Sequence, residues 1–472
     1  MKFSDRLLQL FRYYLPSPFT LAVLLTVFTF ILAMIMTSPD PSNSEPHFFQ
    51  MIGHWQKGFW ELLGFAMQMM LMLVLGHVLA LSDFFKKVVD RSLVFCRDKA
   101  SAAFIVTFVT VAVAYFNWGL GLIVGAILAR KVGEYARINN IKINYALIGA
   151  AGYAGLMVWH GGISGSAPLK IAEEGHMFAE KTGGLPIYIS ETVGSTMNIS
   201  LSVVLLFLLP LAMYWLASRS SADIPDIQIH EPKSDAKSTG PETPAERLDY
   251  SRIVSLFFAA ALFFMFLYQF IIKPGEIDPS AINPNLINLL LLSLCLALHK
   301  HFRAFLDATE TAIKGSTGIM IQFPLYAGIM GIMKYSGMAA LFSQGFVEIS
   351  NETTFPIFTL ISAGIVNFFV PSGGGQWGVQ GGIVLDAAQF LAENAEAAKD
   401  LGVEEVQALV RAAQAKAVMA LSYGDQLTNM LQPFWALPLL GITGLKARQI
   451  LPYTMFLMLV GFLVFVVGLL LF

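Results

Sequence analysis

The chain has 472 residues, of which 56% are hydrophobic and only 13% are charged. Soluble domains carry about 25% charged residues, so this composition excludes an ordinary soluble protein and predicts an all-α polytopic membrane protein that contacts the lipid bilayer. The net charge of −2 gives no reason to expect a nucleic-acid partner. The 2 cysteines, Cys96 and Cys295, are too few and too far apart for a disulfide framework or a cysteine metal site.

Nine apolar stretches approach the length that crosses a bilayer, which takes about 20 residues of helix. In chain order they are 17–37, 60–83, 145–169, 196–217, 252–272, 284–299, 316–339, 416–440 and 451–472. The first stretch follows a basic, amphipathic N-terminus and shows no small-residue cleavage site at a suitable distance. We therefore expect a retained first membrane span rather than a signal peptide.

Two further apolar segments are interrupted in the middle, 101–130 by NWGLG (Asn117 to Gly121) and 356–390 by PSGGGQWG. Each glycine costs about 1 kcal/mol in a helix interior, and non-helical backbone at membrane depth needs protein or water to satisfy its amides. Basic loops flank the first segment and acidic loops flank the second. Because cytoplasmic loops are rich in Lys and Arg, we expect two re-entrant hairpins, the first entering from the cytoplasm and the second from outside.

The polar stretch 219–251 is rich in Pro and Ser and has no periodicity, which predicts a cytoplasmic linker. The halves it separates, 1–218 and 283–472, share the order of two spans, hairpin, broken span and final span, and the linking helix 252–272 turns the second half over. Identities recur in the same order, among them Gln68 with Gln322, Ser82 with Ser336, Gly119 with Gly373, and Tyr153 with Tyr423. Two inverted-topology repeats are how secondary transporters build a site that can face either side. Loop charge places the N-terminus in the cytoplasm and the C-terminus outside.

Two of the predicted spans are also interrupted. The helix that begins at Tyr145 runs into HGGISGSAP (His160 to Pro168), and the helix that begins at Ala415 runs into DQLTNMLQP (Asp425 to Pro433). Unwound backbone frees carbonyl groups for a cation, and the following helix N-terminus offers N–H groups to an anion. We therefore expect two half-sites, one pairing NWGLG with HGGISGS and the other pairing PSGGGQW with DQLTN.

The candidate binding residues all lie in these four segments. Substrate contacts are expected from Asn117, Ser164, Ser166, Ser372, Gly373, Gly374, Gly375, Gln376, Trp377, Thr428 and Asn429. Coupling-ion contacts are expected from Asn117, Gly119, Ser164, Ser372, Asp425, Thr428 and Asn429. An ionisable residue at membrane depth, such as Asp425, is a functional-site hypothesis by default.

Structural interpretations compete with each of these roles. The glycines of the second tip could serve close helix packing, and Asn117 could be a buried hydrogen-bonding residue between helices. His160 is more often a satisfied core histidine than a proton relay. Asp386, on the return arm of the second hairpin, could simply reach the external end of its helix.

The positions of the charged residues narrow the range of expected substrates. A dicarboxylate or phosphate site would favour arginines near the tips, and the sequence places none there. Helix termini with hydroxyl and amide groups suit one carboxylate, and Trp118, Trp159, Trp377 and Trp435 could wall a short apolar tail. A small monocarboxylate is therefore the expected substrate, with dicarboxylate or amino-acid transport and a passive anion channel as alternatives. No activated-nucleophile motif points to an enzyme.

The segments VPSGGGQWGVQG, YGDQLTNMLQPFWALP and HGGISGSAPL resemble the short-chain fatty acid transporter family of bacteria, the AtoE-like proteins, and the resemblance covers nearly the whole chain. It implies uptake of short-chain fatty acids such as butyrate or acetoacetate across the inner membrane, driven by an ion gradient and without a cofactor.

That family is similar to the broader ion transporter superfamily, which implies paired hairpins and broken helices, homodimers and an elevator motion. Superfamily members bind sodium near Ser-Asn-Thr-type motifs. Here the corresponding residues are SGG at the second tip, NWG at the first tip and LTN at the second break, so the coupling ion is expected to be Na⁺ or H⁺.

Overall fold

The computed structural model describes residues 17–61, 63–84, 87, 96, 98–227, 243–273, 275, 284–399 and 401–472. Every regular element in these ranges is helical, apart from an isolated β-bridge between Ile143 and Asp223. The all-α prediction is therefore confirmed for the described part of the chain. The basic N-terminus and the central part of the predicted linker, 228–242, lie outside the described residues.

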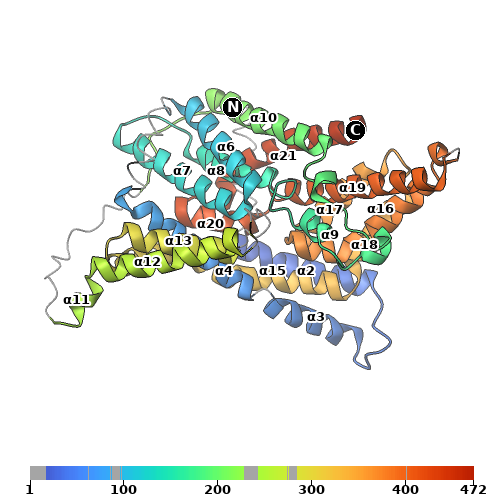
Figure 1. The fold of residues 1–472 in the computed structure, drawn as a ribbon, viewed down its shortest axis with the longest axis horizontal. Helices are drawn as coiled ribbons and strands as arrows, with labels where there is room; N and C mark the ends of the chain where they lie inside the picture. Colours follow the sequence, from blue (N-terminus) through green and yellow to red (C-terminus); the bar gives the residue numbers. More distant parts are fainter. Residues whose placement is uncertain are drawn as a thin grey trace.

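One group of helices forms the lower layer in Figure 1, where α15 packs against α2 and α3, and α13 packs against α4 and α12. These helices are α2 (Pro18–Met36), α3 (His47–Glu61), α4 (Leu63–Leu81), α12 (Arg252–Leu267), α13 (Pro284–Leu298) and α15 (Thr317–Tyr335). Together they match the two stretches of chain that precede the interrupted segments of each half.

The upper layer holds the interrupted segments and the last helix of each half. Its helices are α6 (Lys99–Phe116), α7 (Trp118–Ile138), α8 (Tyr145–Tyr153), α9 (Ser166–Ala172), α10 (Thr196–Arg219), α17 (Phe355–Phe369), α18 (Gly373–Glu393), α19 (Val403–Thr428), α20 (Pro433–Thr443) and α21 (Ala447–Leu471). Figure 1 shows α6, α7 and α8 on the left and α17, α18 and α19 on the right, so segments of the two halves approach each other from opposite ends.

Both interrupted segments fold as helical hairpins. In the first, the turn is at Asn117, and the return helix packs so closely that a Cβ on Gly121 would meet the backbone of Ala114. In the second, the Gln376 side chain donates a hydrogen bond across the hairpin to the Ala363 carbonyl oxygen at 2.8 Å. The glycine-rich interruptions therefore mark the tips of the hairpins.

Six helical stretches of the described residues are long and apolar enough to cross a membrane. They are Phe19–Met36, His47–Leu79, Lys99–Phe116, Thr196–Arg219, Arg252–Ile272 and Ala447–Leu471. Shorter apolar helices cover Tyr145–Met157, Asn285–Leu298, Phe355–Phe369 and Phe434–Thr443. The shorter set includes both broken helices and one hairpin arm, because the interruptions divide their apolar residues into shorter pieces.

Several helices differ from the sequence-based prediction. Helices α3, α14 (Phe302–Ile313) and α16 (Met338–Glu348) were not expected. Helix α19 begins at Val403, well before the apolar stretch, because its first turns are rich in helix-favouring Ala and Glu, and the Glu405 side chain accepts a hydrogen bond from Gly402 N at 2.9 Å. It also continues to Thr428, so the second break covers 429–432 instead of beginning at Asp425.

Candidate functional site

Two buried side chains from opposite halves meet at the centre of the fold. The Nδ1 atom of His160 lies 2.5 Å from Oδ2 of Asp425, and these side chains are 0% and 1% exposed. The other ring nitrogen, Nε2, accepts a hydrogen bond from the backbone N–H of Ala167 at 3.0 Å. Since Nε2 is an acceptor, the ring proton is on Nδ1, and a neutral His160 donates to the Asp425 carboxylate.

This pair leaves one carboxylate oxygen without a partner. Oδ1 of Asp425 is buried and forms no hydrogen bond, and no lysine or arginine of the described residues forms an ion pair with Asp425. With a neutral His160, an ionised Asp425 would leave one negative charge inside the protein. Such a charge costs several kcal/mol unless a cation or proton compensates it. The site is therefore chemically suited to bind a cation.

The first break is held by side chains of both halves. Oε1 of Gln426 accepts hydrogen bonds from the backbone N–H groups of His160 and Gly161 at 2.9 and 3.0 Å. Asn198, near the start of α10, donates to the Gly161 carbonyl oxygen at 2.8 Å and accepts from the hydroxyl of Tyr423 at 3.0 Å. The backbone turns between η1 (Ala154–Met157) and α9 thus receive part of their hydrogen bonding from α19.

The first hairpin tip lies against the first break, as the sequence predicts. Oδ1 of Asn117 accepts from Leu120 N at 2.9 Å and so caps the first turn of α7. The hydroxyl of Ser164 accepts from Trp118 N at 3.1 Å, and Ile163 N donates to the Tyr115 carbonyl oxygen at 2.8 Å. Asn117 and Ser164 are therefore brought to one place.

Gly119 and Ser166 are the other two predicted residues of the first half-site. Gly119 is buried in the first turn of α7, where a Cβ would lie 2.9 Å from the sulfur of Met72 in α4. Ser166 is the first residue of α9 and is half-buried. The tip of the first hairpin thus touches a helix of the lower layer as well as the break.

The second hairpin tip contacts the first break. A Cβ on Gly373 would lie 2.7 Å from Cε1 of His160 and 2.8 Å from the indole of Trp159. Ser372 caps α18 by accepting from Gly375 N at 3.3 Å, while a Cβ on Gly374 would meet no atom within 4 Å. The tip of the second hairpin thus reaches the first half-site, a contact that the predicted pairing of PSGGGQW with DQLTN did not include.

Asn367 connects the second hairpin to the second break, and the sequence analysis missed it. Its side-chain nitrogen lies within hydrogen-bonding distance of the Asp425 carbonyl oxygen (2.7 Å), the Thr428 hydroxyl (2.9 Å) and Oδ1 of Asn429 (2.9 Å). Asn367 and Asn429 are both fully buried. The only signal in the sequence is an amide within the apolar arm FTLISAGIVNFF, where a polar side chain needs a partner.

Three of the four tryptophans expected to form an apolar wall do gather together. The rings of Trp118 and Trp435 lie 5.0 Å apart, and Trp159 lies 6.0 Å from Trp118 and 6.5 Å from Trp435. Trp377 is not part of this cluster. One turn beyond the tip, it packs against Phe178 at 5.4 Å, so that part of the prediction is wrong.

Two further predicted residues have structural partners of their own. Gln376 is buried and donates both to the Ala363 carbonyl oxygen and to Oε1 of Gln380, so its amide group holds the hairpin arms together. Asp386 is largely exposed and forms an ion pair with Lys181. This arrangement agrees with the interpretation that Asp386 reaches the outer end of its helix.

Comparisons with known proteins cover the whole chain. A family model described as "Short chain fatty acid transporter" matches residues 1–472. An Escherichia coli (strain K12) protein whose name proposes short-chain fatty acid transport is 36% identical over 462 residues, 97% of each chain. A Haemophilus influenzae (strain Rd) protein of the same name is 35% identical over 465 residues, covering 97% of this chain and 96% of its own.

Among solved structures, that of the Alcanivorax borkumensis YdaH transporter, described as having an unusual topology, aligns with 96% of this chain and 98% of its own. The sequence identity is 14% and the TM-score is 0.40, which is too low to support an argument about this chain.

Proposed function

Since the chain belongs to the short-chain fatty acid transporter family, we propose that it moves small monocarboxylates such as butyrate or acetoacetate across the bacterial inner membrane together with a cation. It is a multi-pass membrane transporter rather than an enzyme. The proposed cycle needs no cofactor, and its coupling ion is Na⁺ or H⁺.

The observation that carries this proposal is the free oxygen of the buried Asp425 carboxylate. The neutral His160 orients this group but does not neutralise it. A proton or Na⁺ on Oδ1 would remove the buried charge, and this gain in free energy would favour the loaded state. Thr428 and Asn429, which Asn367 links to the backbone of Asp425, complete the proposed cation site together with Asn117, Gly119, Ser164 and Ser372.

The substrate carboxylate is proposed to bind at the second tip. The N-terminus of α18 presents backbone N–H groups to an anion, and Gly374 leaves open space beside them. Ser164, Ser166 and Asn117 contribute polar groups from the first half. Gln376 and Trp377 are proposed to contribute further substrate contacts, since the side-chain oxygen of Gln376 and the indole nitrogen of Trp377 are buried without a hydrogen-bond partner among the described residues.

The route across the membrane is proposed to be alternating access by an elevator motion. The upper layer, which contains the hairpins and breaks, would carry the substrate past the lower layer (Figure 1). In this proposal the halves are inverted repeats, the hairpins are re-entrant, the N-terminus is cytoplasmic, the C-terminus is external, and two chains form a homodimer.

Uptake by purified protein in liposomes tests the proposal. Labelled butyrate should accumulate inside when a Na⁺ or H⁺ gradient is imposed, and uptake should saturate with butyrate concentration. Equilibration without accumulation would indicate a passive channel instead. Strong competition by citrate or by amino acids would favour the dicarboxylate or amino-acid alternatives.

A further inference from the structure

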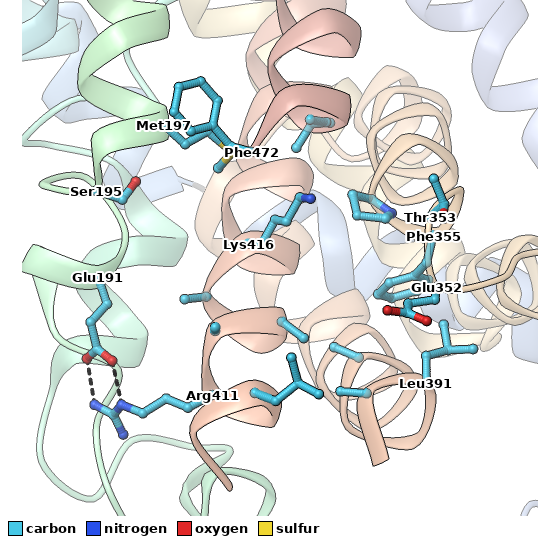
Figure 2. A pocket seen from close by; sticks show the side chains of 18 of the residues that line it. Glu191, Ser195, Met197, Glu352, Thr353, Phe355, Leu391, Arg411, Lys416 and Phe472 are labelled. Atoms are coloured by element: carbon cyan, nitrogen blue, oxygen red, sulfur yellow. Dashed lines mark hydrogen bonds and ion pairs between the residues drawn. The ribbon is translucent and has the colours of Figure 1, made fainter. Parts of the chain in front are cut away.

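A second cavity lies on the side of α19 away from the central site. Its volume is about 730 Å³, and it is bounded by the beginnings of α10 and α17, the facing helices α18 and α19, and the end of α21 (Figure 2). Small-molecule sites typically occupy roughly 300–1,000 Å³. Lys416, which lines the cavity, precedes Asp425 on α19, and their nine-residue separation corresponds to about 14 Å of helix. The cavity is therefore separate from the His160–Asp425 pair.

The walls of this cavity are mainly apolar. The larger apolar side chains come from several different helices: Met197, Phe355, Pro356, Leu391, Leu409 and Leu469. A ligand that fills this space therefore needs an apolar part, because a fully polar molecule would lose its hydration without gaining hydrogen bonds.

Among the charged side chains described in the lining of the cavity, Lys416 is a cation without an ion-pair partner. Arg411 is already bound by Glu191, with nitrogen–oxygen distances of 2.5 and 2.6 Å, as the dashed lines in Figure 2 show. Glu352 is exposed to solvent at the rim. Lys416 is half-buried, and within the described part of the chain its ammonium group has neither a hydrogen bond nor an ion pair. Figure 2 shows it reaching from α19 toward Thr353 and Phe355.

We propose that this cavity is an outer binding site for a fatty acid, whose carboxylate pairs with the ammonium group of Lys416 and whose chain lies along the apolar walls. The inference rests on the proposed function, since it makes the cavity a place where substrate collects before it reaches the central site. One free cation in an apolar cavity matches one carboxylate on one apolar tail. Glu352 does not cancel this attraction, because its exposed charge is screened by water.

Two quantitative expectations follow from the apolar walls and the single cation. Each methylene that enters the cavity should increase affinity about fourfold, so binding should strengthen from butanoate to hexanoate and octanoate. Removing the ammonium group should weaken binding at this site by about tenfold or more, the loss expected for a charge-assisted hydrogen bond.

Binding of radiolabelled hexanoate to purified full-length protein in nanodiscs tests the site directly. Lys416→Gln should weaken or remove one class of binding sites, and Lys416→Arg should restore it because the charge remains. Lys399→Gln is a matched control, since Lys399 is exposed and ion-paired with Glu396 outside the cavity. In liposomes, Lys416→Gln should raise the KM for uptake about tenfold and leave the maximal rate unchanged.

The possible outcomes separate this inference from the proposed function. Binding isotherms that are identical for the wild type and Lys416→Gln would overturn the outer site, whatever the uptake results. Displacement of hexanoate by anionic phospholipid in wild-type nanodiscs, but not in the Lys416→Gln protein, would assign the cavity to a lipid headgroup and also refute it. A wild-type protein that binds hexanoate through Lys416 but transports no short-chain fatty acid would refute only the proposed transport.

Discussion

Replacing Asp425 with Asn should uncouple transport without destabilising the fold. The amide keeps the shape of the carboxylate and can still accept the Nδ1–H of His160, a contact of 2.5 Å in the structure. The loss from replacing a charge-assisted hydrogen bond by a neutral one is about 1–1.5 kcal/mol. Removal of a buried charge, which costs several kcal/mol to bury, offsets that loss. We expect an unchanged or higher Tm.

The same substitution should strongly weaken cation binding. At a separation of 4 Å and an effective dielectric constant of about 20, two unit charges attract by about 4 kcal/mol, which corresponds to roughly a thousandfold in affinity. The assay is accumulation of labelled butyrate in liposomes as a function of the imposed Na⁺ or H⁺ gradient. Asp425→Asn should abolish gradient-driven accumulation, whereas Asp386→Asn, at an exposed ion pair, should retain it.

Wild-type accumulation and cation dependence in Asp425→Asn would refute the assignment of the coupling site. A large decrease in Tm would also contradict the reasoning, because it would show that the carboxylate stabilises the resting fold. Loss of accumulation together with an unchanged Tm is the combination that supports the proposed role.

Three further predictions follow from contacts in the structure. Gly373→Ala should lower the Tm and slow uptake, because its Cβ would overlap the imidazole and indole rings of the first break at a cost of about 1–3 kcal/mol, whereas Gly374→Ala has free space and should leave the Tm unchanged. Asn367→Ala should lower thermal stability by about 1–3 kcal/mol and impair uptake, because the buried amide of Asn429 and the hydroxyl of Thr428 lose their shared partner; a normal Tm would contradict this role. Burial raises the pKa of the Glu191 carboxyl, but the hydrogen bonds from Arg411 and from the Tyr188 backbone, together with the charge of Arg411, outweigh burial and hold the pKa below its ordinary value. The interactions of ionised Glu191 therefore stabilise the protein above about pH 4.5 and lose that contribution as the pH falls further. Arg411→Gln should therefore lower the Tm at pH 7 and show a smaller decrease in Tm on acidification, a difference that thermal unfolding at several pH values measures.

The positions of both hairpin tips could be predicted from local sequence, but their partners could not. Glycine and polar residues inside apolar segments interrupt a helix wherever they occur, so Asn117 and Ser372 were recognisable as turning points. The structure gives both residues the same task, since each caps its return helix by accepting from the N–H three residues later. Their equivalence corresponds to an offset of 255 residues, one more than the offset that aligns Gly119 with Gly373.

The boundaries of the second break could not be predicted from hydropathy alone. Asp425 and Thr428 are polar, which predicts an interruption, yet both remain in the last turns of α19. A polar side chain does not end a helix when a neighbouring segment satisfies it. Here His160 donates a hydrogen bond to the Asp425 carboxylate, and the Asn367 amide donates one to the Thr428 hydroxyl. The helix therefore continues through Thr428.

The sequence by itself determined the class of protein, most of the helices, the two interruptions in each half and, through its motifs, the family. All of these depend on residues close together in the chain, where composition, glycine content and hydropathy act locally. Only the tertiary structure decided that His160 pairs with Asp425, that Asn367 joins the second hairpin to its break, and that Trp377 lies away from the other tryptophans. These contacts join residues that are mostly far apart in sequence, and a buried polar group takes whichever partner the packing of the helices brings within hydrogen-bonding distance.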